Sequence, residues 1–366
     1  MNIVIQVFGS LNAGGAESRM MDVYKRIDRS KVQFHFISLS TDHDQFYEPD
    51  IIRLGGEIYK IPSPREIGLV KHFLTLYRIF KQYDINRTIV HSHTLYHSGL
   101  VLLAARFAKI KRRIAHARSS SSVHSDMKSN IMIYIGKKLI SWCATAKFAV
   151  SINSANFLFN KDKNVVIIPN AIDIDKYIDI PLHIINQYKE EFLLSDQFVL
   201  GHIGRFEPMK NHKFLIELFY KYVQINPHSK LILVGNGSLY NSIQKLVNEL
   251  SLSDKVVFCG IRNDVNYIIK LFDCLLLPSI YEGLPGVILE AQAAGISSLC
   301  SNTITNDVNL NLGLVKYIEL NDINKWLESV VNLHHQTVNP NKIKEAFNAR
   351  KLTIESELQV LYKYYL

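Results

Sequence analysis

The segment DCLLLPSIYEGLPGVILEAQAAG, residues 273–295, decides how the rest of the chain is interpreted. Its apolar start at 273–278 predicts a buried strand, and its Ala-rich end predicts a helix closed by Gly295. Glu282 therefore falls in the loop after the strand, and Glu290 about one turn into the helix. Strand, loop and helix in this order form the repeating unit of parallel α/β sheets, whose ligands bind at the carboxyl ends of the strands.

Apolar runs of the same kind recur in both halves of the chain. The predicted strands are 2–8, 33–39, 87–93, 147–151 and 164–170 in the first half, and 198–204, 230–237, 255–260, 273–278 and 297–301 in the second. Helical patterns separate these runs, which predicts βαβ units on parallel sheets. Because each half has enough strands for its own sheet, we expect an α/β fold of two doubly wound domains facing each other across a central cleft.

The length of the chain also favours two domains, because 366 residues are too many for one ordinary core. The boundary falls near 170–196, where the stretch PNAIDIDKYIDIPLHIINQYKEE lacks a core period. We therefore expect an N-terminal domain at 1–175 and a C-terminal domain at 176–345. The last segment, 346–366, is expected to form a helix that packs back on the N-terminal domain.

The composition is that of a globular protein. Hydrophobic residues make up 48% and charged residues 20%, and no apolar run reaches the ~18 residues of a membrane-spanning helix. The first residues, MNIVIQVFG, form an apolar strand with no basic segment before it, so we expect no signal peptide. The four cysteines form no CxxC pair, which is typical of reduced thiols in a cytoplasmic protein.

The net charge of +9 is unevenly distributed. Residues 1–170 hold 24 Lys and Arg against 12 Asp and Glu, and the rest of the chain holds 18 against 21. The densest basic stretch is AKIKRRIAHAR, residues 108–118. Such a face suits nucleic acid, an anionic membrane leaflet or a phosphorylated substrate, and an ordinary solvated surface is an equal alternative.

A glycine-rich loop follows the first strand in FGSLNAGGAESRMM, residues 8–21. Gly14 and Gly15 allow a ligand close to the backbone, and the free amides of the helix that begins near Gly15 attract anions. Glu17 in the first turn suits the helix dipole. The spacing fits neither GxGxxG nor a Walker A loop, so an ordinary βα turn remains the alternative.

Two cations follow the predicted strand 198–204 in HIGRFEPMKNH, residues 202–212. Arg205 lies just past the strand end and Lys210 lies five residues later, at the start of the next helix. A planar guanidinium and a mobile ammonium that reach the same strand end could clamp a diphosphate. Two solvated surface cations are the alternative.

The segment RTIVHSHTLYHSG, residues 87–99, carries three histidines. His91 and His93 share one face of a strand, whereas His97 falls on the following helix. Two ligands without a nearby carboxylate make a poor metal site. We expect His93, at the carboxyl end of the strand, to face the cleft and bind a sugar hydroxyl, and His91 to be a buried histidine with its own partner.

The loop of the opening segment can bind two polyols at once. Glu290 can accept both hydroxyls of a ribose, as the acidic residue of a dinucleotide fold does, and Glu282 can accept from sugar hydroxyls. The helix begins at Pro285 or Gly286, so its unpaired amides lie between the two carboxylates, where they suit phosphates.

Four motifs now occur in order: GGAE at 14–17, HSH at 91–93, GR-x4-K at 204–210 and the E-x7-E pair at 282 and 290. With these motifs the chain resembles the retaining GT-B glycosyltransferases of family 4, particularly the bacterial enzymes of capsule, exopolysaccharide and O-antigen assembly. The resemblance covers residues 1 to about 335. It implies two Rossmann-like domains, the N-terminal one on the acceptor side and the C-terminal one binding a nucleotide sugar.

The resemblance also implies roles for single residues. His93, Glu282, Arg205 and Lys210 would form the catalytic group, with Arg205 and Lys210 on the diphosphate, Glu290 on the ribose, Glu282 on the transferred sugar and His93 in contact with that sugar. The amides near Pro285, Gly286 and Val287 would meet sugar and phosphate, the backbone of Ile261 would meet the base, and Gly14 and Gly15 would lie on the acceptor side, with Gly15 also near the β-phosphate. Ala171 replaces the glycine usual in the family's hinge.

The implied reaction moves a hexosyl unit, with retention, from a nucleotide sugar to a saccharide or polyprenyl-diphosphate-linked saccharide. UDP is the expected nucleotide. No cofactor and no metal are expected, because we see no Asp-x-Asp motif suited to Mg²⁺, and the cations and helix-start amides can stabilise the leaving diphosphate. Retention needs either a covalent nucleophile or same-face attack; the sequence offers no convincing nucleophile, and the resemblance implies same-face attack.

The expected location is cytoplasmic and peripheral on the inner face of the membrane, through 109–113 and a helix at 131–142. No nucleic-acid partner is expected, because aromatic and basic residues do not interleave. A UDP-sugar 2-epimerase of the same architecture is an alternative that would need acid/base carboxylates in the cleft. A catalytically silent, membrane-associated partner subunit is another.

Overall fold

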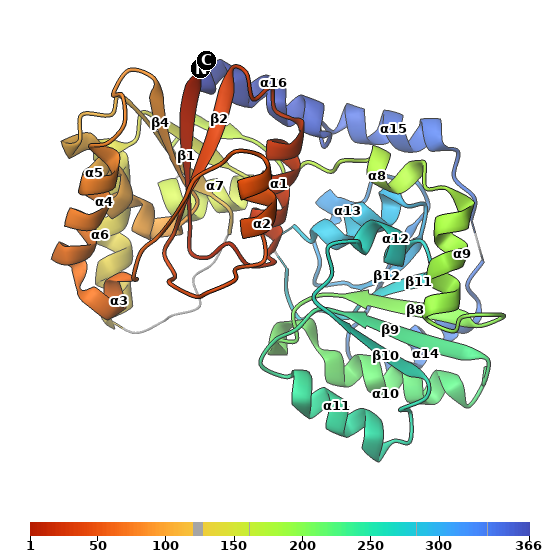
Figure 1. The fold of residues 1–366 in the computed structure, drawn as a ribbon. Coiled ribbons are helices and arrows are strands. Elements are labelled where there is room, and N and C mark those ends of the chain that lie inside the picture. Colours follow the sequence, from red (N-terminus) through yellow and green to blue (C-terminus); the bar gives the residue numbers. More distant parts are fainter. Residues whose placement is uncertain (120–126, 161, 283, 335) are drawn as a thin grey trace. The chain divides into compact units, whose positions relative to one another are not determined.

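The computed structural model describes residues 1–119, 127–160, 162–282, 284–334 and 336–366 (Figure 1). These residues divide into two compact units, one formed by Met1–Ala171 with Lys351–Leu366 and the other by Ile172–Arg350. Each unit holds one parallel sheet with helices around it. The prediction of two doubly wound α/β domains is therefore confirmed.

The chain passes from the first unit to the second after Ala171 and returns at Lys351. The sequence pattern predicted the first crossing a few residues later, at 175/176, and the second a few residues earlier, at 345/346. At the first crossing, Asn266 of the second unit donates to the carbonyl of Lys176 (3.2 Å), and the buried side chains that precede Lys176 stay with that unit. At the second crossing, helix α15 (Pro340–Ala349) runs to its end before the chain returns.

The sheet of the first unit has the strand order β3-β2-β1-β4-β5-β6-β7. The strands are β1 Asn2–Phe8, β2 Val32–Ser38, β3 Ile58–Lys60, β4 Thr88–Ser92, β5 Arg112–Ala117, β6 Ala146–Ala149 and β7 Val165–Ile167. β1 pairs in parallel with β2 on one side and with β4 on the other. The gap between the carboxyl ends of β1 and β4 is therefore a topological switch point, where open α/β sheets bind ligands.

Helices cover both faces of this sheet. They are α1 Gly15–Arg26, α2 Glu48–Arg53, α3 Pro64–Ile67, α4 Leu69–Phe80, η1 Leu95–His97, α5 Ser98–Phe107, α6 Met127–Cys143, α7 Ile152–Phe159 and α16 Ile354–Tyr365. Ile5 and Val7 face a core shared with α4, α5, α6 and α7, whereas Val4 and Phe8 face a core shared with α1, α2 and α16. Burial on both faces explains why β1 is apolar from Ile3 to Phe8 except at Gln6.

The sheet of the second unit has the order β10-β9-β8-β11-β12-β13. The strands are β8 Phe198–Ile203, β9 Ser229–Val234, β10 Val256–Gly260, β11 Cys274–Leu277, β12 Ser297–Ser301 and β13 Val315–Ile318. β8 pairs in parallel with β9 and β11, so the switch point of this unit lies between the carboxyl ends of β8 and β11.

The helices of the second unit are α8 Asp175–Ile178, α9 Leu182–Glu191, η2 Pro208–Lys210, α10 His212–Val223, α11 Tyr240–Glu249, α12 Val265–Ile269, α13 Gly286–Ala293, η3 Asn306–Val308, α14 Ile323–Val331 and α15. α10, α11 and α14 share one core with the sheet, built around Phe219, Leu231 and Trp326. α12 and α13 pack against each other and against α8. The loops that leave β8 and β11 carry most of the predicted donor residues.

Strands β3, β5 and β13 were not predicted. β5 was missed because its two arginines and the flanking lysines suggested a charged surface. In the structure Arg113 donates to the carbonyls of Cys143 (2.7 Å) and Lys111 (3.1 Å), and Arg112 donates to those of Tyr365 and Asn86 (both 3.3 Å). These two arginines thus bond backbone carbonyls of the first unit, and the docking of 109–113 to anionic lipid stays a prediction.

Among the described residues, no helix is both long enough and apolar enough to cross a membrane. Cys143, Cys274 and Cys300 are buried and Cys259 is half-buried, all as free thiols. Burial raises the pKa of the Cys259 thiol to about 11, so this thiol stays protonated at neutral pH.

Candidate active site

The predicted donor residues lie at the switch point of the second unit. Arg205 and Lys210 follow β8, and Glu282 follows β11, the neighbouring strand. The Lys210 ammonium donates to Oε1 of the Glu282 carboxylate. Their side chains are only 15% and 12% exposed, so this ion pair is largely shielded from water. The structure thus joins two residues for which the sequence predicted separate contacts.

Ser279 completes this pair. Its buried hydroxyl donates to the same Oε1 of Glu282 (2.8 Å). Charge-assisted hydrogen bonds of this kind are stronger than neutral ones and fix the geometry of the carboxylate. A donor phosphate at this point would share the Lys210 ammonium with Glu282. Ser279 was not predicted, because no signal beyond its position in the loop after β11 points to it.

Glycine is required where the stem of Lys210 crosses the backbone. A Cβ on Gly204 would lie 3.3 Å from Cδ and Cε of Lys210 and 3.0 Å from Nε2 of His202. A Cβ on Gly235, where φ is +135°, would lie 2.1 Å from the carbonyl oxygen of Gly204. Because carbonyl oxygens cannot yield as a side chain can, the β8 and β9 loops approach this closely only with glycine at position 235.

Arg205 is exposed. Among the hydrogen bonds and ion pairs between described residues, none connects it to the Lys210–Glu282 pair. Its charge acts on Glu207, whose pKa is lowered mainly by hydrogen bonds from the Ser238 hydroxyl (2.9 Å) and the Ser238 backbone amide (3.3 Å), and least by the Arg205 charge. The structure therefore places Arg205 at the strand end, where a ligand can reach it.

The amino terminus of α13 follows Glu282 closely in the chain. Pro285 is its N-cap residue, Gly286 and Val287 begin the helix, and no side chain caps it. The first amides of such a helix are unpaired donors that attract anions. Glu290 lies on the same helix and is half-buried. The sugar, phosphate and ribose contacts expected along this loop stay a prediction.

Ile261, the predicted base contact, follows β10 and its side chain is 47% exposed. The adjoining loop is tied down by Asp264, which accepts two hydrogen bonds from Arg262 (2.8 and 2.6 Å) and one from the Tyr188 hydroxyl (2.5 Å). The carboxylate pairing raises the pKa of Arg262 and holds that of Asp264 below its usual range against the effect of burial. The loop is thus positioned without using the Ile261 backbone.

In the first unit, the predicted residues lie at the switch point between β1 and β4. Gly14 is the N-cap residue of α1, and a Cβ on Gly14 would meet the Glu17 carboxylate at 2.3 Å, whereas a Cβ on Gly15 would meet nothing within 4 Å. The open space at Gly15 is compatible with the predicted close approach of a ligand. His93 follows β4, and its backbone amide donates to the carbonyl of Val7 in β1 (2.9 Å).

Both ring nitrogens of His93 have protein partners. Nδ1 accepts from Nε of Arg118 (3.2 Å), and Nε2 lies 2.8 Å from Oε1 of Gln6. The ring stacks on Phe8 at a centroid distance of 4.3 Å and is 7% exposed. A sugar hydroxyl, the predicted ligand of His93, would have to join one of these two hydrogen bonds.

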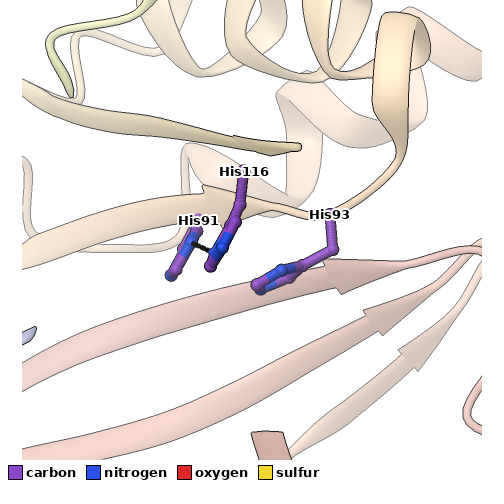
Figure 2. A group of neighbouring side chains, drawn as sticks. All are labelled: His91, His93 and His116. Atoms are coloured by element: carbon purple, nitrogen blue, oxygen red, sulfur yellow. Dashed lines mark hydrogen bonds between the residues drawn. The ribbon is translucent and has the colours of Figure 1, made fainter. Parts of the chain in front are cut away.

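His91, His93 and His116 form one buried cluster (Figure 2). Burial lowers the pKa of each imidazole well below its ordinary value, and the positive charge of Arg118 lowers it further. All three rings are therefore neutral at pH 7. His97 lies apart, with its Nε2 3.2 Å from Nε2 of His72.

The sequence did not predict Gln6, His116, Arg118 or Tyr365 as part of this cluster. Gln6 looked like one more strand residue, His116 and Arg118 belonged to the stretch taken as basic surface, and Tyr365 is the penultimate residue of the chain. The usable signal was the short run IAHA after the two arginines, which in the structure forms the last four residues of β5, all of them buried.

Two family models match consecutive parts of the chain. Residues 13–176 match the model described as Glycosyltransferase Family 4, and residues 184–311 match the model described as Glycosyl transferases group 1. Together they cover every strand of the two sheets except β1 and β13, and most of the loops described above.

The chain is 30% identical over 333 residues to the glycosyltransferase EpsF of Bacillus subtilis (strain 168), covering 89% of this chain and 86% of the relative. It is 29% identical over 322 residues to the UDP-Gal:alpha-D-GlcNAc-diphosphoundecaprenol alpha-1,3-galactosyltransferase of Escherichia coli, covering 78% and 79%. The crystal structure of Anabaena Alr3699/HepE in complex with UDP and glucose shares the fold, with a TM-score of 0.79 at 18% identity over 99% of each chain. The chain belongs to glycosyltransferase family 4 and has the GT-B fold.

Proposed function

We propose that the protein transfers a hexosyl unit, with retention and without a metal ion, from a UDP-sugar to a saccharide or polyprenyl-diphosphate-linked saccharide in bacterial surface polysaccharide synthesis. The observation that carries this proposal is the Lys210–Glu282 pair beside the uncapped start of α13. It combines a cation and helix amides for a diphosphate with a carboxylate for a polyol. The name of the Escherichia coli relative, a galactosyltransferase with a UDP-linked donor and a diphosphoundecaprenol-linked acceptor, supports the same chemistry.

The proposed step breaks the bond between the anomeric carbon of the donor and the oxygen of its β-phosphate. The acceptor hydroxyl attacks from the same face, and a phosphate oxygen of the departing diphosphate takes the hydroxyl proton. Lys210, Arg205 and the first amides of α13 meet the negative charge that grows on that diphosphate. Glu282 would orient the transferred sugar, Glu290 would bind the ribose, and Ile261 would meet the base through its backbone.

The donor site is tested by calorimetry against UDP-, GDP- and ADP-sugars with EDTA present. We expect one nucleotide sugar to bind saturably and to release its nucleoside diphosphate slowly, with both effects lost in Lys210→Ala and Glu290→Ala. Lys213→Ala is the matched control, because Lys213 lies on α10 with its side chain 75% exposed and only a 3.9 Å pairing to Glu217. Absence of binding by folded protein would contradict the donor site.

The stereochemical course is tested on the product. Once a donor and an acceptor are found, the anomeric proton coupling in the NMR spectrum shows whether the configuration of the donor sugar is kept. An inverted product would contradict same-face attack. Conversion of the donor sugar into its 2-epimer would assign the epimerase reaction instead, and nucleotide-sugar binding without turnover on any acceptor would favour the silent subunit.

We further propose that the protein acts in the cytoplasm, at the inner face of the membrane, and contacts anionic lipid through α6. The exposed apolar residues of this helix are Ile131, Met132, Tyr134, Ile135 and Trp142. The Arg106 guanidinium stacks over the Trp142 ring at 4.2 Å. A cavity of about 160 Å³ beside the helix is lined by three lysines, of which only Lys147 has an acidic partner among the described residues, Asp162. Apolar side chains flanked by cations suit an anionic bilayer surface.

This contact is tested by sedimentation with vesicles. We expect the protein to bind vesicles that contain phosphatidylglycerol and not pure phosphatidylcholine, and the Ile135→Ser/Trp142→Ser variant to lose binding. Leu182→Ser removes a similarly exposed apolar side chain from α9 of the second unit and should bind as the wild type does. Equal binding by all three proteins would contradict the assignment to α6.

A further inference from the structure

The histidine cluster of the first unit is one directed chain of hydrogen bonds. Figure 2 shows the rings of His91 and His93 from β4 and its end, and that of His116 from β5. The links run from Arg118 to His93, from His93 to Gln6, from Gln6 to Tyr365, from Tyr365 to His91 and from His91 to His116, over 3.2, 2.8, 3.3, 2.6 and 3.1 Å. Every member except Arg118 is at least nine-tenths buried.

The first two links have only one possible direction. A guanidinium donates and never accepts, so Nδ1 of His93 must be the acceptor. A neutral imidazole then carries its proton on Nε2, which donates to Oε1 of Gln6. This fixes the Gln6 amide as well, because its nitrogen must be the atom that faces the Tyr365 hydroxyl.

The remaining links follow from counting satisfied groups. If the Tyr365 hydroxyl donates to Nδ1 of His91, then Nε2–H of His91 donates to Nδ1 of His116, and only Nε2–H of His116 lacks a partner. In the reverse direction His116 donates to His91, and His91 donates to the Tyr365 hydroxyl. Two groups then lack a hydrogen-bond partner, the Tyr365 hydroxyl proton and the Nε2 lone pair of His116. Nε2 of His116 is indeed a buried atom without a partner. Since buried polar groups are costly to leave unpaired, the first direction is favoured.

We propose that Arg118, Gln6 and Tyr365 are positioning residues that hold His93 as the tautomer with its proton on Nε2, so that His93 acts on a sugar ligand only as a hydrogen-bond donor. A sugar hydroxyl that reaches this edge of the ring can only accept, and it shares Nε2–H with Oε1 of Gln6, 2.8 Å away. The stack on Phe8 fixes the plane of the His93 ring, and the hydrogen bonds to Arg118 and Gln6 fix the rotation of the ring within that plane.

Tyr365 is itself anchored from several sides. Its backbone carbonyl accepts from the side chains of Asn2 (2.8 Å) and Arg112 (3.3 Å). The end of α16 is thus tied to the amino ends of β1 and β5, and the hydroxyl reaches between Gln6 and His91. The penultimate residue of the chain thereby orients a histidine 272 residues earlier in the sequence.

The same accounting disfavours a metal ion in the cluster, although the three histidines could offer ligand atoms within 4.8 Å of one another. Five of the six ring nitrogens already have a protein partner. A cation would have to displace Arg118 or stand beside its positive charge.

The test is NMR of protein with ¹⁵N-labelled histidine, in which long-range proton–nitrogen couplings identify the protonated ring nitrogen. We expect His91, His93 and His116 all to be neutral at pH 7 with the proton on Nε2, and added Zn²⁺ to leave their signals unchanged. A proton on Nδ1 of His93, an imidazolium, or a signal shifted by zinc would overturn the proposal. This readout needs no substrate, so it is independent of the proposed function.

A second arm uses variants and rests on the proposed transferase reaction. Arg118→Met should allow a second tautomer of His93 and lower kcat/KM about tenfold, the cost of one misdirected hydrogen bond. Arg118→Lys, which can still donate a hydrogen bond to His93, should keep most of the tautomer preference and most of kcat/KM. Arg113→Met is the control, because it removes from β5, the strand that ends just before Arg118, an arginine whose guanidinium bonds backbone carbonyls instead of His93. A single tautomer in folded Arg118→Met would overturn the positioning role of Arg118, and a protein without activity would leave the NMR result to decide.

Discussion

Lys210 and Glu282 form an ion pair across 72 residues of sequence, because the strands that precede them, β8 and β11, are neighbours in the sheet. The pair lies where the crossover connections of the second unit diverge. Lys210 thus pairs with the Glu282 carboxylate inside the protein and, in the proposed reaction, also with the diphosphate of the donor. The two compete for a single ammonium, and this competition can be measured.

Glu282→Gln should separate nucleotide binding from sugar turnover. The amide keeps the shape of the side chain but releases the Lys210 charge, so UDP alone should bind about three- to tenfold more tightly. Turnover of the UDP-sugar should fall at least about tenfold, because the acceptor for sugar hydroxyls is weakened. Calorimetry with UDP and a turnover assay measure the two effects. Lys210→Met should weaken both, and weaker UDP binding by Glu282→Gln would show that the carboxylate does not compete.

Ser279→Ala tests whether the hydroxyl that bonds Glu282 matters for the reaction. Removing one hydrogen bond to a charged group should lower kcat/KM about fivefold while the thermal stability changes little. Ser238→Ala is the matched control, since Ser238 gives the same kind of bond to Glu207 outside the pair. Equal effects of the two substitutions on kcat/KM would argue against a specific role for Ser279.

The sequence predicted most of the donor half of the site because its residues follow strands within short segments. Apolar runs located β8 and β11, and the Pro-Gly step located the start of α13 within one residue. The Lys210–Glu282 contact depends on which strands are neighbours, and strand order is not encoded in any local pattern. The pair could therefore not be predicted, although each member was.

The histidine cluster was harder to predict for a related reason. It joins β1, β4, β5 and the last turn of α16, four segments whose meeting depends on the whole first unit. Charge density was also misleading at β5, because Arg112 and Arg113 bond backbone carbonyls inside the unit rather than water. A run of basic residues is evidence for a charged surface only when the strand period is absent.

Tyr365→Phe should destabilise the first unit more than Tyr362→Phe does. Loss of the Tyr365 hydroxyl leaves Gln6 and His91 with buried unpaired atoms, at a cost of about 2 kcal/mol. Tyr362 lies on the same helix, and its hydroxyl accepts only one partly exposed amide, that of Asp28 (2.8 Å), so its loss should cost about 1 kcal/mol or less. Urea unfolding, monitored through hydrogen exchange within the first unit, measures the loss of unfolding free energy in both variants. A larger effect of Tyr362→Phe would contradict the importance of the chain from Gln6 to His91.

Glu357 gives the first unit a pH-dependent stability. This carboxyl lies on α16 and is 3% exposed, and burial raises its pKa to about 7, against the opposing charges of Arg118 and Arg19. The folded state therefore holds the proton more tightly than the unfolded state, whose glutamate titrates near 4.5. The stabilisation is complete below about pH 4.5 and is lost as the pH rises to about 7, on the order of 3 kcal/mol in all.

Glu357→Gln should remove this slope, because an amide does not titrate. The buried neutral histidines act in the opposite sense, since the unfolded state binds more protons than they do below about pH 6.5. Their contribution is the same in both proteins and cancels in the difference between them. The free energy of unfolding of wild type and Glu357→Gln, measured from pH 5 to pH 8, should therefore diverge with rising pH in favour of the variant. Parallel curves would place the pKa of Glu357 near its unfolded value and would mean that its carboxylate is compensated by Arg118 even though it is buried.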